Sequence, residues 1–475
     1  MAHDLIVSSG IAVTPSGEEP LDIAIDGETI SEVGPHGSLG KAARTIDATG
    51  KYILPGLFDP HIHFGVGDDI SKWSDDLMAE DFSHASRDAL IGGVTTIATT
   101  TQIGPLPMMD YYRRTVRCGE SRSWCDFKIT SVVNTEDHIR EIPEVAAAGG
   151  SDFKFFTGYV GEQAAELGMD PSGITPDFFY LACEALARCQ SPVFAKIHAE
   201  DPYVRGILVD RVRAMGRDDT LVAWAETTPE WAESLQIYTY GLIANDRGVP
   251  FYPVHISSAH TTETVKNLKS QGWNISGETL SMFLCTTAEE LDARGMGAKA
   301  KIQPPVRFEK DRDRLWQGIR EGTITLVGTD SHSFSTVFKE SVDFWHCVVG
   351  INLQMADALP LLYNEGVLKR RVELHQLVKV MSENVARMYG LFPQKGAIAV
   401  GSDADLVIFD PERELRLGAN RYQSQNDYSL WEGQTVQGAP AITVLRGAVV
   451  AEDGEIADEQ PSGQLVNGRR RRDAA

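Results

Sequence analysis

The chain has 475 residues, 42% of them hydrophobic, and its formal net charge at pH 7 is −23, which argues against nucleic acid as a partner because phosphates are bound by basic surfaces. It contains no run of about eighteen apolar residues, so we expect no membrane span, and its start lacks a basic, apolar leader, so we expect no secretory signal. Six scattered cysteines without metal-type pair spacing favour reduced thiols in a cytoplasmic enzyme.

Both ends of the chain show short segments in which apolar and polar residues alternate. Residues 4 to about 52 contain several such segments, separated by Ser16-Gly17 and Asp26-Gly27, and similar segments recur at 404–409 and 441–447. This pattern is typical of antiparallel strands. We expect residues 1–52 and 398–460 to pair into one small β-sandwich domain, followed by a polar tail over 461–475 that includes Arg469 to Arg472 and lies disordered or at a subunit contact.

The middle of the chain, residues 53–397, alternates predicted strands and helices. Strand cores are expected near 53–61, 94–101, 127–134, 152–157, 193–198, 251–256, 273–278 and 324–329. Helical stretches are expected between most of them, including 80–90, 177–188, 229–244 and 311–321. Eight strand–helix repeats indicate a (β/α)8 TIM-like barrel, an α/β fold in which the chemistry lies at the carboxyl ends of the strands.

Two histidines end the first predicted barrel strand. His61 and His63 are two residues apart in an extended segment, so both imidazoles point to the same side. Neutral imidazole is the commonest nitrogen ligand of zinc and similar ions. If this motif is taken alone, the alternative to a metal site is a pair of histidines on a polar strand face.

The later strands supply further candidate ligands at the same rim. Lys154 lies in the fourth strand, while His198, His255 and Asp330 follow the fifth, sixth and eighth strands. Together with the first two histidines they would suffice for two divalent ions that share a bridging hydroxide.

Lys154 differs from the other candidate ligands, because a protonated amine has no acceptor and cannot bind a cation. If this segment is taken alone, the alternative to a metal-binding role is a lysine in an ion pair. In a site that lowers its pKa, however, the neutral amine can react with carbon dioxide, and the two oxygens of the resulting carbamate could bridge two metals.

With these residues in place, the chain resembles the cyclic amidases of the amidohydrolase superfamily, the hydantoinases and dihydropyrimidinases. The resemblance covers most of the chain, through the segments 384–391, 395–406 and 426–433. It implies ring opening of a cyclic amide or ureide at a carbon–nitrogen bond. The assembly that it implies is usually a homotetramer, with a homodimer as the alternative.

The resemblance also implies roles for individual residues. His61, His63 and Asp330 would hold one metal, His198 and His255 the other, and carboxylated Lys154 would bridge them. We expect zinc, for which manganese or cobalt could substitute. Asp330 would transfer the proton, and Tyr159, five residues after the lysine, would donate to the developing oxyanion unless it is a core aromatic. Asp59 is expected to support the histidines or the structure around them.

Several segments depart from the family pattern, so the sequence specifies the reaction better than the substrate. Only Glu278-Thr279 remains of the usual Glu-Thr-Cys-Pro-Gln-Tyr-Leu, and Gln303 stands where hydantoinases commonly have serine. Asp330-Ser331-His332 breaks the usual Asp-His order, and residues 348–353 do not reproduce the loop that frames the substrate amide.

Other functions remain as alternatives to this interpretation or are disfavoured by single residues. Dihydroorotases carry an arginine after the second histidine, where this chain has Phe64. Allantoinase, which fits Tyr159 less well, and cyclic imide hydrolase stay as alternatives, and so does a non-catalytic scaffold, although all six ligand positions are present. Phe155, Phe156 and several bulky apolar residues after the first strands predict that the substrate ring carries an apolar or aryl substituent. The alternative is that these residues are core or subunit contacts. Those after the strands are Trp73, Pro107, Met108, Met109, Tyr111 and Tyr112.

Overall fold

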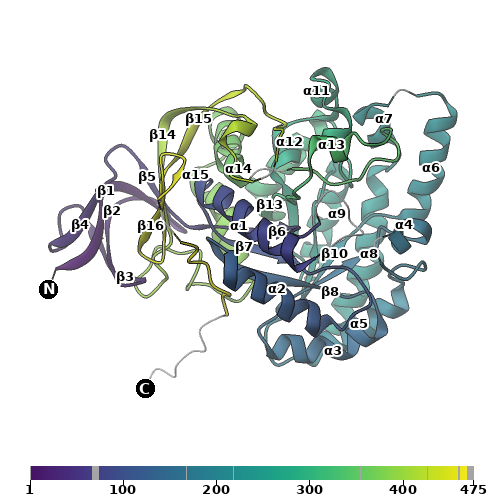
Figure 1. Cartoon of the computed structure of the whole chain (residues 1–475), viewed down its shortest axis with the longest axis horizontal. Coiled ribbons are helices and arrows are strands. Elements are labelled where there is room, and N and C mark those ends of the chain that lie inside the picture. Colours follow the sequence, from purple (N-terminus) through teal and green to yellow (C-terminus); the bar gives the residue numbers. More distant parts are fainter. Residues whose placement is uncertain are drawn as a thin grey trace.

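A computed structural model of the chain shows a barrel with a sheet at one end (Figure 1). It describes residues 2–66, 74–166, 168–217, 219–352, 355–424, 426–457 and 460–467. Trp73 and Arg469 to Arg472 lie outside these described residues. No helix in the described ranges has both the length and the apolar character needed to cross a membrane.

Eight parallel strands form the barrel, which confirms the predicted fold class. Six of them are hydrogen-bonded in the order β11-β10-β9-β8-β7-β6, and β12 pairs with β13. Isolated parallel bridges from Phe251 to Ile275 and from Ile62 to Ser331 connect the two groups and close the barrel. The strands are β6 (Leu57–Ile62), β7 (Val94–Thr100), β8 (Asp126–Val132), β9 (Asp152–Phe156), β10 (Phe194–His198), β11 (Phe251–Pro253), β12 (Gly277–Leu280) and β13 (Ile324–Gly328).

Helices cover the outside of the barrel, and local sequence sets several of their ends. The hydroxyls of Thr135 and Ser258 accept hydrogen bonds from the first turns of α3 and α9, and Gly248 and Gly322 end α8 and α12 in the left-handed conformation. The longer helices are α1 (Asp75–Ile91), α2 (Met108–Arg122), α3 (Glu136–Ala147), α5 (Pro176–Ala187), α6 (Pro202–Ala214), α8 (Glu230–Arg247), α9 (Ala259–Ser270), α12 (Glu309–Glu321) and α14 (Met355–Leu362). Shorter ones include α4 (Gly161–Glu166), α7 (Leu221–Glu226), α10 (Ser281–Cys285), α11 (Ala288–Ala293), α13 (Thr336–Lys339), α15 (Leu374–Val378) and α16 (Asn384–Met388), with π-helical turns η3 (Tyr363–Lys369) and η4 (Lys379–Glu383).

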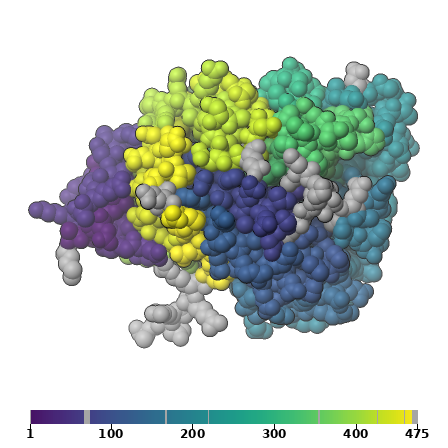
Figure 2. Space-filling view, in the orientation of Figure 1, coloured from purple at the N-terminus to yellow at the C-terminus, as the bar shows by residue number. Residues whose placement is uncertain are grey.

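Strands from both ends of the chain pair with one another, as their shared alternation predicted, and they form one nine-stranded sheet where a β-sandwich was expected. In Figures 1 and 2 the purple N-terminal and yellow C-terminal segments lie side by side at one end of the molecule. Pairing is mixed rather than purely antiparallel, because β4 and β5 run parallel to β1. The strands are β1 (His3–Thr14), β2 (Gly17–Asp26), β3 (Thr29–Pro35), β4 (Ala42–Asp47), β5 (Tyr52–Pro55), β14 (Leu406–Arg416), β15 (Thr435–Leu445), β16 (Ala448–Glu452) and β17 (Glu455–Ile456).

The predicted strand over 53–61 is in fact two strands that serve different sheets. β5 pairs with β1 and β14 in the end sheet, whereas β6 pairs with β7 in the barrel. They separate at Gly56, where an added Cβ would lie 2.2 Å from Thr95 Oγ1 and 2.8 Å from Asp405 Cβ. Only glycine fits this close approach. Gly56 therefore allows the chain to pass from the end sheet into the barrel at this point.

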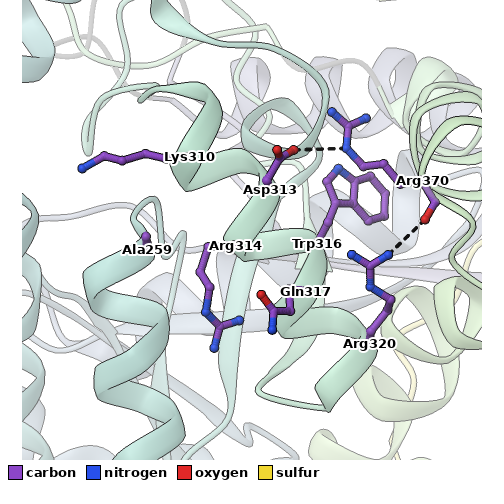
Figure 3. Close-up of a pocket in the computed structure, with 8 residues that line it drawn as sticks. All are labelled: Ala259, Lys310, Asp313, Arg314, Trp316, Gln317, Arg320 and Arg370. Carbon is purple, nitrogen blue, oxygen red and sulfur yellow. Dashed lines mark hydrogen bonds and ion pairs between the residues drawn. The ribbon is translucent and has the colours of Figure 1, made fainter.

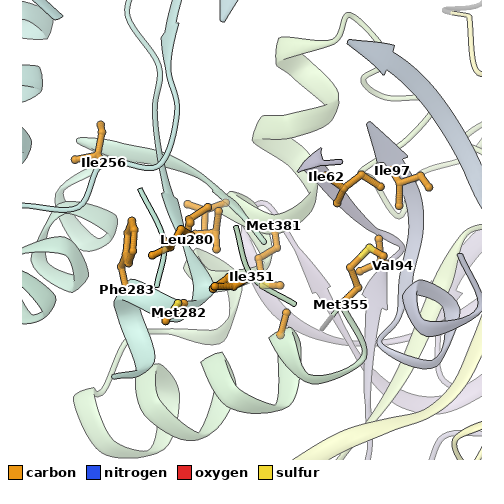
Figure 4. Close-up of a cluster of buried hydrophobic side chains, with 14 of the residues drawn as sticks. Ile62, Val94, Ile97, Ile256, Leu280, Met282, Phe283, Ile351, Met355 and Met381 are labelled. Carbon is orange, nitrogen blue, oxygen red and sulfur yellow. The ribbon is translucent and has the colours of Figure 1, made fainter. Parts of the chain in front are cut away.

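A continuous apolar core fills the space between the barrel strands and the C-terminal helices. Figure 4 shows Ile62 and Ile97 from the strands near Met355 of α14 and Met381 of η4, with Leu280 close by. All five side chains are 5% exposed or less. Burial of apolar surface stabilises the fold by roughly 25 cal/mol per Å² and helps to hold the barrel strands in place.

Polar contacts join the barrel to the end sheet. Lys395 Nζ lies 2.6 Å from both Asp126 Oδ2, at the start of β8, and Asp405 Oδ2, just before β14. The first part of the predicted polar tail is also attached, since Phe127 exchanges backbone hydrogen bonds of 2.9 Å with Gln464 and Val466.

Candidate metal centre

The six predicted ligands converge at the carboxyl ends of the barrel strands. His61 Nε2 lies 3.3 Å from His63 Nε2 and 3.2 Å from Lys154 Nζ, and His63 Nε2 lies 3.1 Å from Asp330 Oδ1. His198 Nδ1 and His255 Nε2 are 2.9 Å apart, and the His61 and His255 rings are 5.7 Å apart. The ligand atoms of His61, His63 and Asp330 all lie within 4.8 Å of one another, a spacing that one cation could span.

Two of these residues have an unusual backbone conformation. His255 has φ of +40° and Asp330 has φ of +54°, in the left-handed region that side chains other than glycine rarely adopt. Each is the second residue after the end of a barrel strand, β11 for His255 and β13 for Asp330. Such strain persists where surrounding contacts impose it, and it typically marks functional sites.

Acceptor groups hold the imidazole nitrogens that face away from the cluster. His61 Nδ1 donates to Glu278 Oε1 at 2.9 Å, and His198 Nε2 lies 3.4 Å from Glu200 Oε2. His63 Nδ1 is hydrogen-bonded to Thr100 Oγ1 at 2.8 Å. These contacts orient the rings and leave His61 Nε2, His63 Nε2 and His198 Nδ1 directed at the cluster, as metal sites require.

Sequence reasoning missed all three orienting residues. Glu278 belongs to a motif that was noticed only for its divergence, while Glu200 lies two residues after His198, so alternation in an extended segment could have revealed it. Thr100 is one of several threonines in and beside β7, and nothing in that run distinguishes it.

Asp59 supports the histidine strand through the backbone rather than through an imidazole. Its Oδ1 accepts from the backbone N–H of His61 at 3.1 Å and of Thr329 at 3.3 Å, and its Oδ2 accepts from the Thr329 hydroxyl at 2.6 Å. Burial raises the pKa of Asp59 to about 6. The carboxyl therefore ties β6 to the end of β13, next to Asp330.

Burial and like charge favour the uncharged forms of the basic groups. Lys154 is fully buried, and burial together with the neighbouring Lys196 ammonium lowers its pKa to about 7. Lys196 is itself paired, with its Nζ 3.1 Å from Asp152 Oδ2. Burial likewise lowers the pKa of His61, His63, His198 and His255. Neutral imidazoles and a neutral amine beside a carboxylate fit a pair of divalent cations.

Aromatic side chains form one wall beside these groups. The Tyr159 ring lies 5.1 Å from the His198 ring and 6.0 Å from the Phe156 ring, and burial raises the pKa of the Tyr159 hydroxyl. Phe156 also lies 6.3 Å from His63. Phe155 points the other way and contacts Phe179 of α5 at 4.9 Å, as strand alternation requires.

The other predicted apolar residues belong mainly to the helical layer. Met108, Met109, Tyr111 and Tyr112 all lie in α2 and are buried. The Tyr112 hydroxyl donates to Ala148 O at the end of α3. Packing between helices, one of the interpretations left open by the sequence, therefore accounts for Tyr112.

His332 is a further neighbour of the cluster that was not predicted as a site residue. Its ring stacks on His63 at 4.5 Å and on Phe334 at 5.0 Å, and its Nδ1 donates to Asp330 O at 2.9 Å. Burial lowers the pKa of His332 to about 3. The altered Asp330-Ser331-His332 order thus places a neutral imidazole against a predicted ligand.

A hollow of about 560 Å³ lies elsewhere, on the outer helical layer (Figure 3). Three of its four cations have acidic partners: Lys310 pairs with Glu230, Arg314 with Glu263, and Arg370 with Glu365. The fourth, Arg320, donates to the backbone carbonyl of Arg370. The hollow is lined by Ala259, Lys310, Asp313, Arg314, Trp316, Gln317, Arg320 and Arg370. None of the predicted site residues lines it.

Known proteins of similar sequence and structure belong to the amidohydrolase family and include hydantoinases. The profile of the amidohydrolase family matches residues 52–450. The chain is 30% identical to an L-hydantoinase of Paenarthrobacter aurescens, covering 98% of both chains, and 30% identical to a D-hydantoinase of Ralstonia pickettii, covering 98% of this chain and 99% of that one. The solved L-hydantoinase (dihydropyrimidinase) from Arthrobacter aurescens superimposes with a TM-score of 0.87 at 30% identity, covering 98% of this chain and 100% of that one.

Proposed function

Since the chain belongs to the amidohydrolase family, we propose that it is a metal-dependent hydrolase that opens a cyclic amide or ureide at a carbon–nitrogen bond. The product would be an N-carbamoyl amino acid or a related half-amide. The observation that carries this proposal is the convergence of four imidazoles, Lys154 and Asp330 at one end of the barrel. Buried groups hold the outer ring nitrogens of His61, His63 and His198. The barrel, which begins with β6 after Gly56, would hold the chemistry.

Two divalent ions, zinc in the first instance, would occupy this cluster. His61, His63 and Asp330 would hold one ion and His198 and His255 the other, with Lys154 between them. When bound, such a pair polarises a carbonyl and makes water a nucleophile near neutral pH.

Lys154 would serve as a carbamate. Its neutral amine nitrogen would form a bond to the carbon of carbon dioxide as one C=O π bond opens, and would release one proton to solvent. The resulting carbamate would carry one negative charge shared by its two oxygens. The lowered pKa of this buried amine supports the step, because only the neutral form has a free electron pair.

Asp330 and Tyr159 would perform the remaining chemistry. The Asp330 carboxylate would accept the proton of the attacking water and deliver it to the leaving ring nitrogen. The Tyr159 hydroxyl would donate to the oxyanion that develops on the attacked carbonyl. Its burial beside His198 supports this role, because burial keeps the phenol protonated.

The substrate would be a five- or six-membered cyclic amide, ureide or imide, with a preference for apolar ring substituents. Phe156, whose ring faces His63 and Tyr159, supports the apolar preference. The test is a comparison of kcat/KM for dihydrouracil, 5-phenylhydantoin, allantoin and succinimide at equal metal loading. Opening of allantoin alone, or of none of the four, would contradict the proposed substrate class.

Metal analysis of the purified protein distinguishes the enzyme from a non-catalytic scaffold of the same fold. The enzyme should hold about two divalent ions per chain, the number used in two-metal sites, and should lose activity with a chelator. A chain that holds no stoichiometric pair of ions would be a scaffold.

The active form would be a homotetramer or homodimer. Four large apolar side chains of α8 recur on one face and are 44–59% exposed: Trp231, Leu235, Tyr238 and Leu242. Tyr203 and Ile207 of α6 are also exposed, and Gln236 of α8 donates to Asp201 at the start of α6 at 3.0 Å. A second copy of the chain would cover this apolar face.

The protein would act in the cytoplasm. All six cysteines are unpaired, and five of them are buried. Free thiols in these numbers suit a reducing compartment.

A further inference from the structure

Lys196 forms an ion pair inside the barrel, close to the proposed metal centre. Its side chain and that of Asp152 are fully buried, and Lys196 Nζ lies 3.1 Å from Asp152 Oδ2. Residues two apart in a strand point to the same side. Lys196 therefore faces the barrel interior with His198 of β10, and Asp152 does so with Lys154 of β9.

A second contact of the same ammonium crosses the barrel. Lys196 Nζ donates to Pro60 O at 2.6 Å, and Pro60 precedes His61 in β6. In the sheet, β7, β8 and β9 lie between β6 and β10, so backbone hydrogen bonds do not set the distance between these two strands directly. The long, flexible stem of the lysine and its three donors allow one side chain to connect them.

Two hydroxyl groups complete this buried cluster. The Tyr389 hydroxyl, just after α16, lies 2.6 Å from Asp152 Oδ2 and 3.2 Å from Pro60 O. The Thr130 hydroxyl of β8 donates to the same oxygen of Asp152. Lys196 and Tyr389 thus contact the same two acceptors, which belong to β6 and β9.

A gain in stability does not explain why two charges are buried here. The cost of removing them from water largely cancels their attraction, and apolar side chains of similar volume often serve a fold equally well or better. The cluster does provide a defined geometry, because the ammonium of Lys196 has to reach Pro60 and Asp152 at once.

We infer that Lys196 is a positioning residue, which sets the distance between the two proposed metal sites by connecting β6 to β9 and β10. This inference rests on the proposed function, from which it takes the two ions. Two-metal sites hold their ions about 3.5–4 Å apart. His61 and His63, at the end of β6, would bind one ion and His198, at the end of β10, the other. A shift between these strands would therefore change the spacing.

The two ions should respond differently when this connection is lost. His61 and His63 keep their own partners, Glu278 and Thr100, so the first ion should bind as before. The second ion must in addition lie within reach of a bridge that it shares with the first. Its affinity should fall when the spacing between the two sites changes.

The test variant combines Lys196→Met with Asp152→Asn, because the loss of both charges leaves no unpaired ion in the barrel. Tyr389→Phe removes one hydroxyl of the same cluster, keeps the ring, and decides the question if the double variant does not fold. Lys128→Met is the matched control. Lys128 is another buried lysine of a barrel strand, but its Nζ donates to Gly149 O at 2.8 Å, after α3.

Zinc titration of the metal-free proteins against a chelator measures both affinities, and X-ray absorption of the loaded proteins measures the metal–metal distance. In the double variant the distance should change, and the second ion should bind roughly 10- to 100-fold more weakly, the usual effect of residues that orient ligands. The kcat should fall on the order of 10²-fold, as expected for a displacement of about 1 Å. Tyr389→Phe should show smaller changes in the same direction, and Lys128→Met none.

An unchanged metal–metal distance in the folded variants, or an unchanged affinity for the second ion, would overturn the inference. The same changes in Lys128→Met would also overturn it, because they would reflect the loss of any buried lysine. A wild type that binds no pair of ions would overturn the proposed function itself, on which the inference rests.

Discussion

His61 Nδ1 lies 2.9 Å from Glu278 Oε1, although 217 positions separate the two residues in the chain. Both side chains are essentially inaccessible to solvent, and burial raises the pKa of Glu278 to about 7. Tyr252 donates to the other carboxyl oxygen of Glu278. One buried acid therefore fixes the ring of a central predicted ligand.

Glu278→Gln should weaken metal binding by roughly 10- to 100-fold while the protein stays folded, because the imidazole loses its charged acceptor but keeps its neighbours. Competition with a chelator measures the affinity. Glu263→Gln, which changes an exposed pair with Arg314, is the control and should bind metal normally. Unchanged affinity in Glu278→Gln would show that this carboxyl is structural only.

Asp330→Asn should reduce kcat by on the order of 10²-fold or more, because the amide cannot carry the proton to the leaving nitrogen. Steady-state kinetics on samples of known metal content provide the measurement. Near-normal kcat with both ions bound would refute the assignment of Asp330 as the proton carrier.

Lys154→Ala should lose metal and activity together, because the proposed bridge between the two ions disappears. Added short carboxylic acids such as acetate should partly restore both, since a carboxylate can occupy the place of the carbamate. Metal analysis and turnover, each with and without the acid, test this. A high-resolution map with two ions beside an unmodified amine would rule out the carbamate.

Tyr159→Phe should lower kcat with little change in metal content, by an amount equivalent to about 2.7–4 kcal/mol, the loss expected for one oxyanion donor. Tyr240→Phe is the control: its hydroxyl donates to Ile174 O at 2.5 Å, so its loss should affect stability rather than kcat. If Tyr159→Phe and the wild type turn over substrate equally fast, the role of Tyr159 is packing only.

Leu235→Glu combined with Leu242→Glu should dissociate the proposed oligomer, because two carboxylates would have to be buried on the apolar face of α8. Sedimentation velocity measures the assembly state. Val400→Glu changes an apolar side chain that is 66% exposed and lies outside this face, and it should leave assembly intact. A wild type that sediments as a monomer would exclude the oligomer altogether.

The sequence by itself determined the barrel and the grouping of the predicted ligands. Strand alternation directs His61 and His63 to one side, and the rule that parallel strands end at one rim brings them to His198, His255 and Asp330. Both arguments are local, because each needs only the position of a residue within its own strand.

Only the tertiary structure decided which groups support those ligands. Glu278 reaches His61, and Thr100 reaches His63, only once their strands have come together in the fold. The division of the first predicted strand at Gly56 likewise depends on Thr95 and Asp405, which come close only in the folded chain. Periodicity specifies the side to which a residue points, whereas its partner across the barrel depends on strand register and on packing between distant segments.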